Sequence, residues 1–295
     1  MNKRKLLATR VCSFVLALLM VLTLVPAKQA QAATKKKNLT LYVGESIYYT
    51  DYYKVKKVST SKKSVVSVSK DKQYNYRTNM TAKKPGKATV TIKTTRGTHK
   101  LNITVKKFDL SVSMKDMGHG YILVSVKNNT KQIFDSAYIA YSIVDLTGAE
   151  VALDSVKVYS LLPGKTSYTT ISYNQYNYTP DMTNSKAKAY APDRYPNHSY
   201  TVRSSKIETN ISNEILDSSS ISFNLTYKNR STSSVRGNVF VLFYDKNDNV
   251  IGLQTKSLYL NAGAADTSKI TGYLNLMDGY DHYKIITRAY SSKLK

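Results

Sequence analysis

Apolar and polar residues alternate with a period of two along much of the chain after residue 33. In the segments 88–92, 101–105 and 221–227, every second side chain is apolar, as in a strand that buries one face. No segment after residue 33 keeps the i, i+3, i+4, i+7 spacing of an amphipathic helix. Turn-forming pairs such as Pro85-Gly86 separate the runs. The pattern predicts an all-β fold.

The turns divide this chain into units of similar length. Short strands grouped in units of roughly 70–100 residues are typical of antiparallel β-sandwiches. A chain of 295 residues has room for two or three ordinary domains. We therefore expect three tandem β-sandwich modules, at residues 33–107, 108–200 and 201–295.

The first 32 residues have a different pattern. A basic head at 1–10 is followed by an apolar run at 11–25 and an Ala30-Gln31-Ala32 exit, the three parts of a secretory signal peptide. An uncleaved membrane anchor is the alternative, but the run is shorter than the roughly 17–25 apolar residues that span a bilayer. We predict a signal peptide at 1–32, with Ala30, Ala32 and Ala33 forming the cleavage site, so that the mature chain starts near Ala33. The mature chain would be extracellular, secreted or held non-covalently at the cell surface, with no membrane span.

The net charge of +25 is concentrated in the first module. Residues 33–107 hold 17 Lys and 2 Arg against 3 acidic residues. Lysine is a strongly hydrated point charge, whereas arginine suits bidentate recognition of phosphate or bases. A solubilising surface is one interpretation. The other is attraction to an anionic cell-wall polymer, an acidic polysaccharide or a lipid headgroup layer.

Four segments of the first module occur in the order of a known family. They are the L-x-V-G-E opening within 39–46, the serine-rich turn before Val-Ser-Val at 59–68, the Pro-Gly-Lys-Ala-Thr stretch at 82–92, and the closing strand at 101–105. On these residues the module resembles a bacterial immunoglobulin-like domain of group 2. The resemblance implies an immunoglobulin-like β-sandwich of the kind found in surface proteins and adhesins, without catalytic residues.

The second and third modules are similar to each other. A shift of about 100 residues aligns Asp145 with Asp245 and Tyr159 with Tyr259, as expected of a diverged duplication. The strand that ends at Asp245, followed by a polar turn and a second strand, is similar to the FxLYD group of bacterial surface domains. That resemblance implies further immunoglobulin-like sandwiches and no known chemistry.

Residues that would support catalysis or metal binding are scattered. The single cysteine, Cys12, lies in the predicted signal peptide, so the mature chain offers no thiol nucleophile, disulfide or cysteine ligand. The four histidines form no pair at metal-ligand spacing, and no serine stands in a G-x-S-x-G or S-x-x-K motif. We expect no enzyme, no cofactor and no metal site.

One segment begins like a calcium-binding loop. Asp245, Asn247 and Asn249 give a D-x-N-x-N start, but Val250 and Lys256 stand where a complete loop needs Gly and Glu. A hairpin turn rich in Asp and Asn is the better interpretation.

Tyrosine is the most informative residue type, with 25 copies in a chain without Trp. A tyrosine ring has an apolar face and a polar tip, which suits stacking on sugars or protein contacts. The alternative is that tyrosine fills strands and cores. Export makes nucleic acid the weaker ligand for the basic-aromatic cluster. The candidate ligand-binding residues are Tyr173, Tyr176 and Tyr178 in a predicted exposed loop, and Tyr74, Tyr76 and Arg77 in that cluster.

These features together predict an all-β protein of three tandem immunoglobulin-like antiparallel β-sandwich modules after a signal peptide. We expect an exported bacterial surface or secreted protein that is not an enzyme. It would bind envelope or extracellular polymers, an anionic cell-wall polymer or polysaccharide above all, with other surface proteins as further partners and no specific nucleic acid. The alternative is a structural spacer or assembly subunit of a surface complex.

Overall fold

The chain is built of strands joined by turns over the described residues, 34–193 and 198–294 of the computed structural model. Within these ranges the only helices are two 3-10 turns, η1 (Ser204–Lys206) and η2 (Leu274–Leu276). The predicted all-β fold class is confirmed. No helix in the described ranges is long and apolar enough to cross a membrane. The predicted signal peptide and its cleavage residues Ala30, Ala32 and Ala33 lie outside the described residues.

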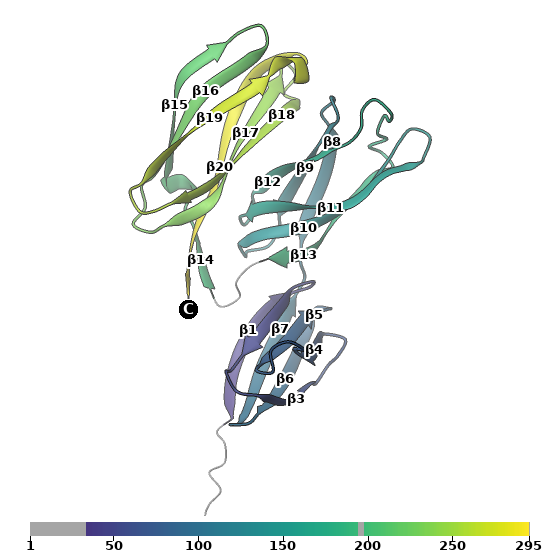
Figure 1. Ribbon diagram of the computed structural model, residues 1–295, viewed down its shortest axis with the longest axis vertical. Coiled ribbons are helices and arrows are strands. Elements are labelled where there is room, and N and C mark those ends of the chain that lie inside the picture. The colour runs from purple at the N-terminus through teal and green to yellow at the C-terminus, as the bar shows by residue number, and fades with distance from the viewer. Residues whose placement is uncertain (1–33, 194–197, 295) are drawn as a thin grey trace, which may run out of the picture.

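The first seven strands form two sheets around one apolar core, at one end of the molecule (Figure 1). A four-stranded sheet has the order β1-β7-β6-β3, with β1 parallel to β7, and a three-stranded sheet has the order β2-β5-β4. Leu41, Met80 and Ile103 are buried in the core. The strands are β1 (Lys35–Tyr42), β2 (Ser46–Thr50), β3 (Val55–Thr60), β4 (Val66–Lys70), β5 (Arg77–Ala82), β6 (Gly86–Thr94) and β7 (Thr98–Lys106).

The next six strands form two three-stranded antiparallel sheets. Their orders are β11-β10-β13 and β12-β9-β8. Ile122, Val124 and Phe134 are completely buried in their common core. The strands are β8 (Leu110–Asp116), β9 (Tyr121–Asn128), β10 (Phe134–Val144), β11 (Glu150–Leu161), β12 (Thr166–Ser172) and β13 (Lys186–Asp193).

The last strands form a four-stranded sheet, β14-β20-β17-β18, and a three-stranded sheet, β15-β16-β19. Every second residue of β16 is buried, among them Phe223 and Leu225, which is the alternation expected from the sequence. β14 starts before the predicted module boundary at residue 200 and pairs with β20. The strands are β14 (His198–Val202), β15 (Ile207–Leu216), β16 (Ser220–Asn229), β17 (Val235–Asp245), β18 (Val250–Leu260), β19 (Ala265–Tyr273) and β20 (Tyr280–Leu294).

The second and third groups of strands repeat one topology. In chain order, β8 to β13 correspond to β15 to β20, and the sheet orders β12-β9-β8 and β11-β10-β13 recur as β19-β16-β15 and β18-β17-β20. β14 is an additional edge strand of the third group. The duplication seen in the sequence is therefore also present in the strand order.

The hairpin turns of the two copies are also the same. The Oδ1 atom of Asp145 accepts hydrogen bonds from the backbone N–H groups two and four residues later, at 2.9 and 3.0 Å. The Oδ1 atom of Asp245 accepts the equivalent pair, at 2.9 and 2.8 Å. The side chains of Thr147 and Asn249 also donate to these carboxylates, and these side-chain bonds first, then the backbone bonds, lower the pKa of Asp145 and Asp245. The segment that begins at Asp245 is thus the predicted hairpin turn.

The first and second groups of strands meet around the end of β1. Tyr42 packs in the core of the second group, with its ring centroid 5.0 Å from that of Phe134 in an edge-to-face arrangement. Gly44 follows at φ +87°, and a Cβ there would overlap the carbonyl oxygen of Tyr190. Because only glycine combines that conformation with that backbone approach, Gly44 sets how closely the two groups pack.

The second and third groups lie side by side (Figure 1). The rings of Tyr168 and Phe240 are in edge-to-face contact at 5.5 Å between centroids. The Nε atom of Arg288 donates to the carbonyl oxygen of Thr166 at 2.9 Å. Contacts from β12 to β17 and β20 therefore fix the side-by-side packing.

Candidate functional site

The predicted loop site is only partly assembled. Tyr173 is half-buried, and its hydroxyl donates to Oδ1 of Asp116 at 3.2 Å. Burial first and then the charge of Asp116 raise the pKa of Tyr173 to about 12. Tyr176 is 90% exposed and Tyr178 is also exposed. The expected exposure therefore holds for Tyr176 and Tyr178 but not for Tyr173, which stabilises the adjoining β8–β9 hairpin.

The predicted basic-aromatic cluster is assembled in the first module. The guanidinium carbon of Arg77 lies 4.1 Å from the ring centroid of Tyr74 and 5.8 Å from that of Tyr76. Tyr48 adds a third ring at 5.6 Å and is 67% exposed. Arg77 makes cation–π contacts with these rings, and Tyr74 and Tyr76 are half-buried, so Tyr48 is the most exposed ring of the cluster.

The outer face of the four-stranded sheet of the first module is strongly basic. Lys36 and Lys100 are register partners on β1 and β7, and Lys57 and Lys93 are partners on β3 and β6. All four side chains are exposed. The strands β1, β3, β6 and β7 contain no Asp or Glu. We call this surface the lysine face.

Polar uncharged side chains form the middle of the lysine face. Asn102 on β7 donates from Nδ2 to Oδ1 of Asn38 on β1 at 3.1 Å. The hydroxyl of Thr89 on β6 donates to Oδ1 of Asn102 at 3.4 Å. Neighbouring strands are about 4.8 Å apart, so this ladder crosses the sheet. Lys36, Lys100, Lys57 and Lys93 all lie on one side of it, and Lys87, the register partner of Thr104, lies on the other.

The three acidic residues of the first module take part in internal contacts. Glu45 is buried and accepts the backbone N–H of Tyr42 at 2.8 Å. Asp51 lies 2.6 Å from Nε2 of the buried His99. Asp71 accepts backbone N–H groups of its own turn, which lower its pKa. None of these contacts brings a carboxylate to the lysine face.

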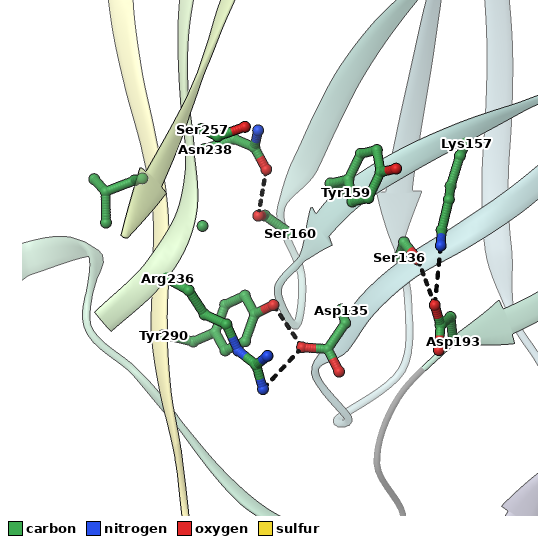
Figure 2. A pocket seen from close by; sticks show the side chains of 12 residues that line it. Asp135, Ser136, Lys157, Tyr159, Ser160, Asp193, Arg236, Asn238, Ser257 and Tyr290 are labelled. Atoms are coloured by element: carbon green, nitrogen blue, oxygen red, sulfur yellow. Dashed lines mark hydrogen bonds and ion pairs between the residues drawn. The ribbon is translucent and has the colours of Figure 1, made fainter. Parts of the chain in front are cut away.

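A cleft of about 280 Å³ lies between the second and third groups of strands (Figure 2). Its inner end is built on Asp135 at the start of β10. The carboxylate accepts the hydroxyl of Tyr290 at 2.6 Å and that of Tyr200 at 2.8 Å, and it lies 3.5 Å from Nη2 of Arg236. Burial, and then the negative charge of Asp135, raise the pKa of Tyr290. The two groups of strands are thus joined by one shared carboxylate.

A second polar contact crosses the cleft. The hydroxyl of Ser160 on β11 donates to Oδ1 of Asn238 on β17 at 2.7 Å, and both residues are buried (Figure 2). Ser160 has a positive φ of 58°, which is uncommon for a residue with a side chain. Ser160 thus reaches Asn238 from a left-handed backbone position near the end of β11.

The outer end of the cleft is lined by an ion pair and an exposed ring. Nζ of Lys157 lies 3.0 Å from Oδ2 of Asp193, which also accepts the hydroxyl of Ser136 at 3.3 Å (Figure 2). The same ammonium lies 5.4 Å from the ring centroid of Tyr159. The outer end therefore combines paired charges with an aromatic surface.

The aromatic surface extends from the cleft across the sheet β11-β10-β13. Nζ of Lys157 also lies 5.1 Å from the ring centroid of Tyr138, and the Tyr138 and Tyr190 centroids are 5.9 Å apart with an interplanar angle of 34°. Tyr159, Tyr138 and Tyr190 are all exposed. We call these three residues, one on each strand of the sheet, the tyrosine row.

The cleft is lined by groups that can form hydrogen bonds and by the ring of Tyr159. No group of three or more His, Cys, Asp or Glu side chains suited to a metal ion occurs among the described residues. The lining groups are hydroxyls, one amide, two carboxylates and two cations. Such a set can orient a polar ligand.

Sequence reasoning found the loop and the basic-aromatic cluster but missed the cleft. Asp135, Lys157, Arg236 and Tyr290 lie on four strands of two modules, and no sequence spacing links them. A partial signal was present, because Lys157 and Tyr159 are two residues apart on one strand and so share its face.

Comparisons with known proteins add no family. No family model matches the chain, and no curated protein matches it. The resemblances to group 2 bacterial immunoglobulin-like domains and to FxLYD domains therefore stay predictions.

Solved structures with tandem domains align with the chain at low similarity. The I9–I11 tandem from titin is 12% identical over 86% of this chain and 95% of that chain, with a TM-score of 0.19. The FN1–FN3 domains of chicken CNTN1 are 8% identical over 85% and 98%, with a TM-score of 0.16. Red sea bream transglutaminase is 9% identical over 70% of this chain and 37% of that chain, with a TM-score of 0.20. These scores carry no argument, so the fold assignment depends on the sheets described above.

Proposed function

We propose that this chain is an exported, non-catalytic protein of the bacterial cell surface that holds anionic extracellular polymers on its lysine face. The observation that carries the proposal is the composition of that face: four strands with exposed lysines and no acidic residue. The signal-like segment at 1–32 supports export. On this proposal the first module is an immunoglobulin-like domain of group 2 and the later modules are of the FxLYD kind.

The arrangement of charges favours a polymer over a small anion. Lys36 and Lys100 lie on β1 and β7, and Lys57 and Lys93 lie toward the β3 edge of the same sheet, all on one side of the Asn–Thr ladder. The lysines are spread over a sheet surface, and each ammonium is a flexible, hydrated point charge. A chain with repeated phosphate or carboxylate groups would contact several of them at once, and the separate weak attractions would add.

The polymer is a cell-wall polymer or acidic polysaccharide, not a specific nucleic acid. The lysine face has no aromatic residue in its four strands except Tyr42, which is buried in the neighbouring core. Base stacking on aromatic side chains is the usual contribution beyond charge in single-strand binding, and this face has no group to supply it.

A structural spacer is the second candidate function. The joints at Tyr42 and Phe134, and at Tyr168 and Phe240, favour it because they hold the three groups in a fixed arrangement. A spacer needs these joints but does not need the lysine face. The two functions therefore predict different results for a variant without these lysines: polymer binding is lost if the lysine face is the binding site, and a spacer is unaffected.

Sedimentation with purified cell walls separates the two functions. We expect the secreted chain to bind walls at low salt and to lose binding as NaCl rises, because exposed charges are screened beyond about 10 Å at 0.1 M. Replacing Lys57, Lys93 and Lys100 together by Gln should abolish most of the binding. The control replaces three exposed lysines of the third module, Lys246, Lys269 and Lys284, and should bind like the parent.

Equal loss in both triple variants would indicate nonspecific charge attraction and contradict a specific role of the lysine face. No binding by the parent chain would favour the spacer. Export is tested separately, by sequencing the N-terminus of the secreted protein, where we expect Ala33. A chain retained with its first residues intact would contradict the signal peptide.

A further inference from the structure

We infer that the cleft between the second and third groups of strands, together with the tyrosine row, is a binding site for a neutral oligosaccharide. This site is separate from the lysine face, and its ligand differs in charge. The inference depends on the pairing of charges in the cleft, on the exposure of three aligned tyrosines, and on the preformed geometry of the cleft walls.

The charges in the cleft favour an uncharged ligand. Lys157 is paired with Asp193 at 3.0 Å, and Arg236 lies 3.5 Å from Asp135. An anionic ligand would meet the carboxylate beside each cation, and a cationic ligand would meet the cation beside each carboxylate. A neutral ligand rich in hydroxyl groups can donate to the carboxylates and accept from the cations without separating either pair.

The uncharged lining groups suit hydroxyls as well. The hydroxyls of Ser136 and Ser160 and the amide of Asn238 also line the cleft. A hydroxyl group both donates and accepts, as sugar hydroxyls do. The volume of about 280 Å³ is just below the roughly 300–1,000 Å³ typical of sites for drug-sized ligands. The cleft can therefore hold a short part of a polymer, and the rest of the ligand must lie outside it.

The tyrosine row supplies the surface for the rest of the ligand. Tyr159 lines the cleft and is 50% exposed, and Tyr138 and Tyr190 continue the row over two neighbouring strands. Each pyranose ring has an apolar face of C–H groups that packs on an aromatic ring, while its hydroxyls point to the sides. Strands about 4.8 Å apart place successive tyrosines on one surface. A chain of sugars leaving the cleft would thus lie across the sheet.

Lys157 links the cleft and the row. Its ammonium lies 5.4 Å from the Tyr159 ring centroid and 5.1 Å from that of Tyr138, and it is bonded to Asp193. These contacts place the ammonium close to both rings. This position leaves an ammonium donor at the point where a sugar on one ring would be joined to a sugar on the next.

Hydrogen bonds within the protein hold the walls of the cleft in position. Asp135 bonds to Tyr290 and Tyr200, and Ser160 bonds to Asn238. These contacts fix two walls that come from different modules. Preorganised walls reduce the entropy lost on binding, which matters for a weakly binding ligand such as a sugar.

Titration calorimetry with the secreted chain tests the inference. The probes are neutral hexasaccharides (cellohexaose, xylohexaose, mannohexaose and chitohexaose) and one acidic control, hexagalacturonate. We expect at least one neutral probe to bind, and Tyr159→Ala to weaken that binding by tenfold or more. Tyr138→Ala should also weaken it.

The repeat provides a matched control. Tyr259 is the counterpart of Tyr159 in the third module and is 77% exposed, but it does not line the cleft. Tyr259→Ala should bind sugar like the parent chain. Thermal melts should show equal stability for both variants, because both rings are exposed.

Three results would overturn the inference: no neutral probe binds, hexagalacturonate binds best, or Tyr159→Ala and Tyr259→Ala behave alike. The outcome is independent of the proposed function. The triple lysine variant should lose cell-wall binding and keep sugar binding, while Tyr159→Ala should do the reverse.

Discussion

The side-chain amides of Asn128 and Asn229 make the same hydrogen bonds in two different modules. Nδ2 of Asn128 donates to the carbonyl oxygen of Gln132 at 2.7 Å, and Nδ2 of Asn229 donates to that of Ser233 at 2.8 Å. In each copy Oδ1 accepts the backbone N–H two residues later at 2.9 Å. Both residues are completely buried at the end of a strand. The second and third modules thus share the same loop closure.

Replacing either asparagine by alanine should destabilise the chain. The substitution leaves backbone groups of the loop without a partner, and each such buried group costs about 1–3 kcal/mol. We expect Asn128→Ala and Asn229→Ala to lower the free energy of unfolding by similar amounts in urea titrations. Asn177→Ala is the control, since that side chain is exposed in a loop. A neutral effect at either buried position would contradict the assigned role.

Gly44 should tolerate no side chain. Gly44 and Gly148 have nearly equal φ values, +87° and +85°, but a Cβ at Gly148 meets open space, whereas one at Gly44 overlaps the carbonyl oxygen of Tyr190. Both alanine variants pay the cost of the left-handed conformation, about 1–3 kcal/mol. Only Gly44→Ala must also separate the first and second groups. We expect its melting temperature to fall further than that of Gly148→Ala, and small-angle scattering to show a less compact chain.

Tyr173 should make the chain labile in alkali. Burial and the neighbouring Asp116 raise its pKa from 10.0 to about 12. A raised folded-state pKa contributes stability that is complete below pH 10 and is lost as the pH rises through 12, because the unfolded chain releases its proton first. The melting temperature of the parent chain should fall more steeply from pH 10 to 12 than that of Tyr173→Phe. Parallel curves would show that the hydroxyl has no such role.

The strands could be predicted from the sequence because a buried sheet face imposes a period of two, as in β16 with Phe223 and Leu225. The turn at Asp245 could be predicted because its hydrogen bonds are local. The exposed position of Tyr176 follows from its polar surroundings. The partial burial of Tyr173 could not be predicted, because the residue that binds its hydroxyl, Asp116, comes from another hairpin.

The cleft could not be predicted because its geometry depends on how two modules pack. Asp135 and Arg236 occupy equivalent positions after the buried Asn128 and Asn229 of the two copies, seven residues later in each. The duplication places them on matching strands, but only the side-by-side packing brings them to 3.5 Å. The alternation of polar and apolar residues predicts a strand and its exposed face. It does not predict which other module packs against that face.

Asp135 should contribute more to stability than an exposed acidic residue. Its side chain is 15% exposed and accepts two tyrosine hydroxyls beside Arg236. Asp135→Asn keeps the shape but removes the charge, and hydrogen bonds to a charged group contribute about 1.5–3 kcal/mol each. We expect a clear loss of stability and a looser packing of the second and third groups, visible as a larger radius of gyration.

The matched substitution is Asp109→Asn. Asp109 lies 3.7 Å from Nζ of Lys107, with both side chains largely exposed, and such surface pairs contribute about 0–1 kcal/mol. We expect Asp109→Asn to have the same melting temperature as the parent chain. An unchanged melting temperature for Asp135→Asn would contradict the assigned role of the shared carboxylate. The contact between Tyr168 and Phe240 would then be the main contact that holds the second and third groups of strands together.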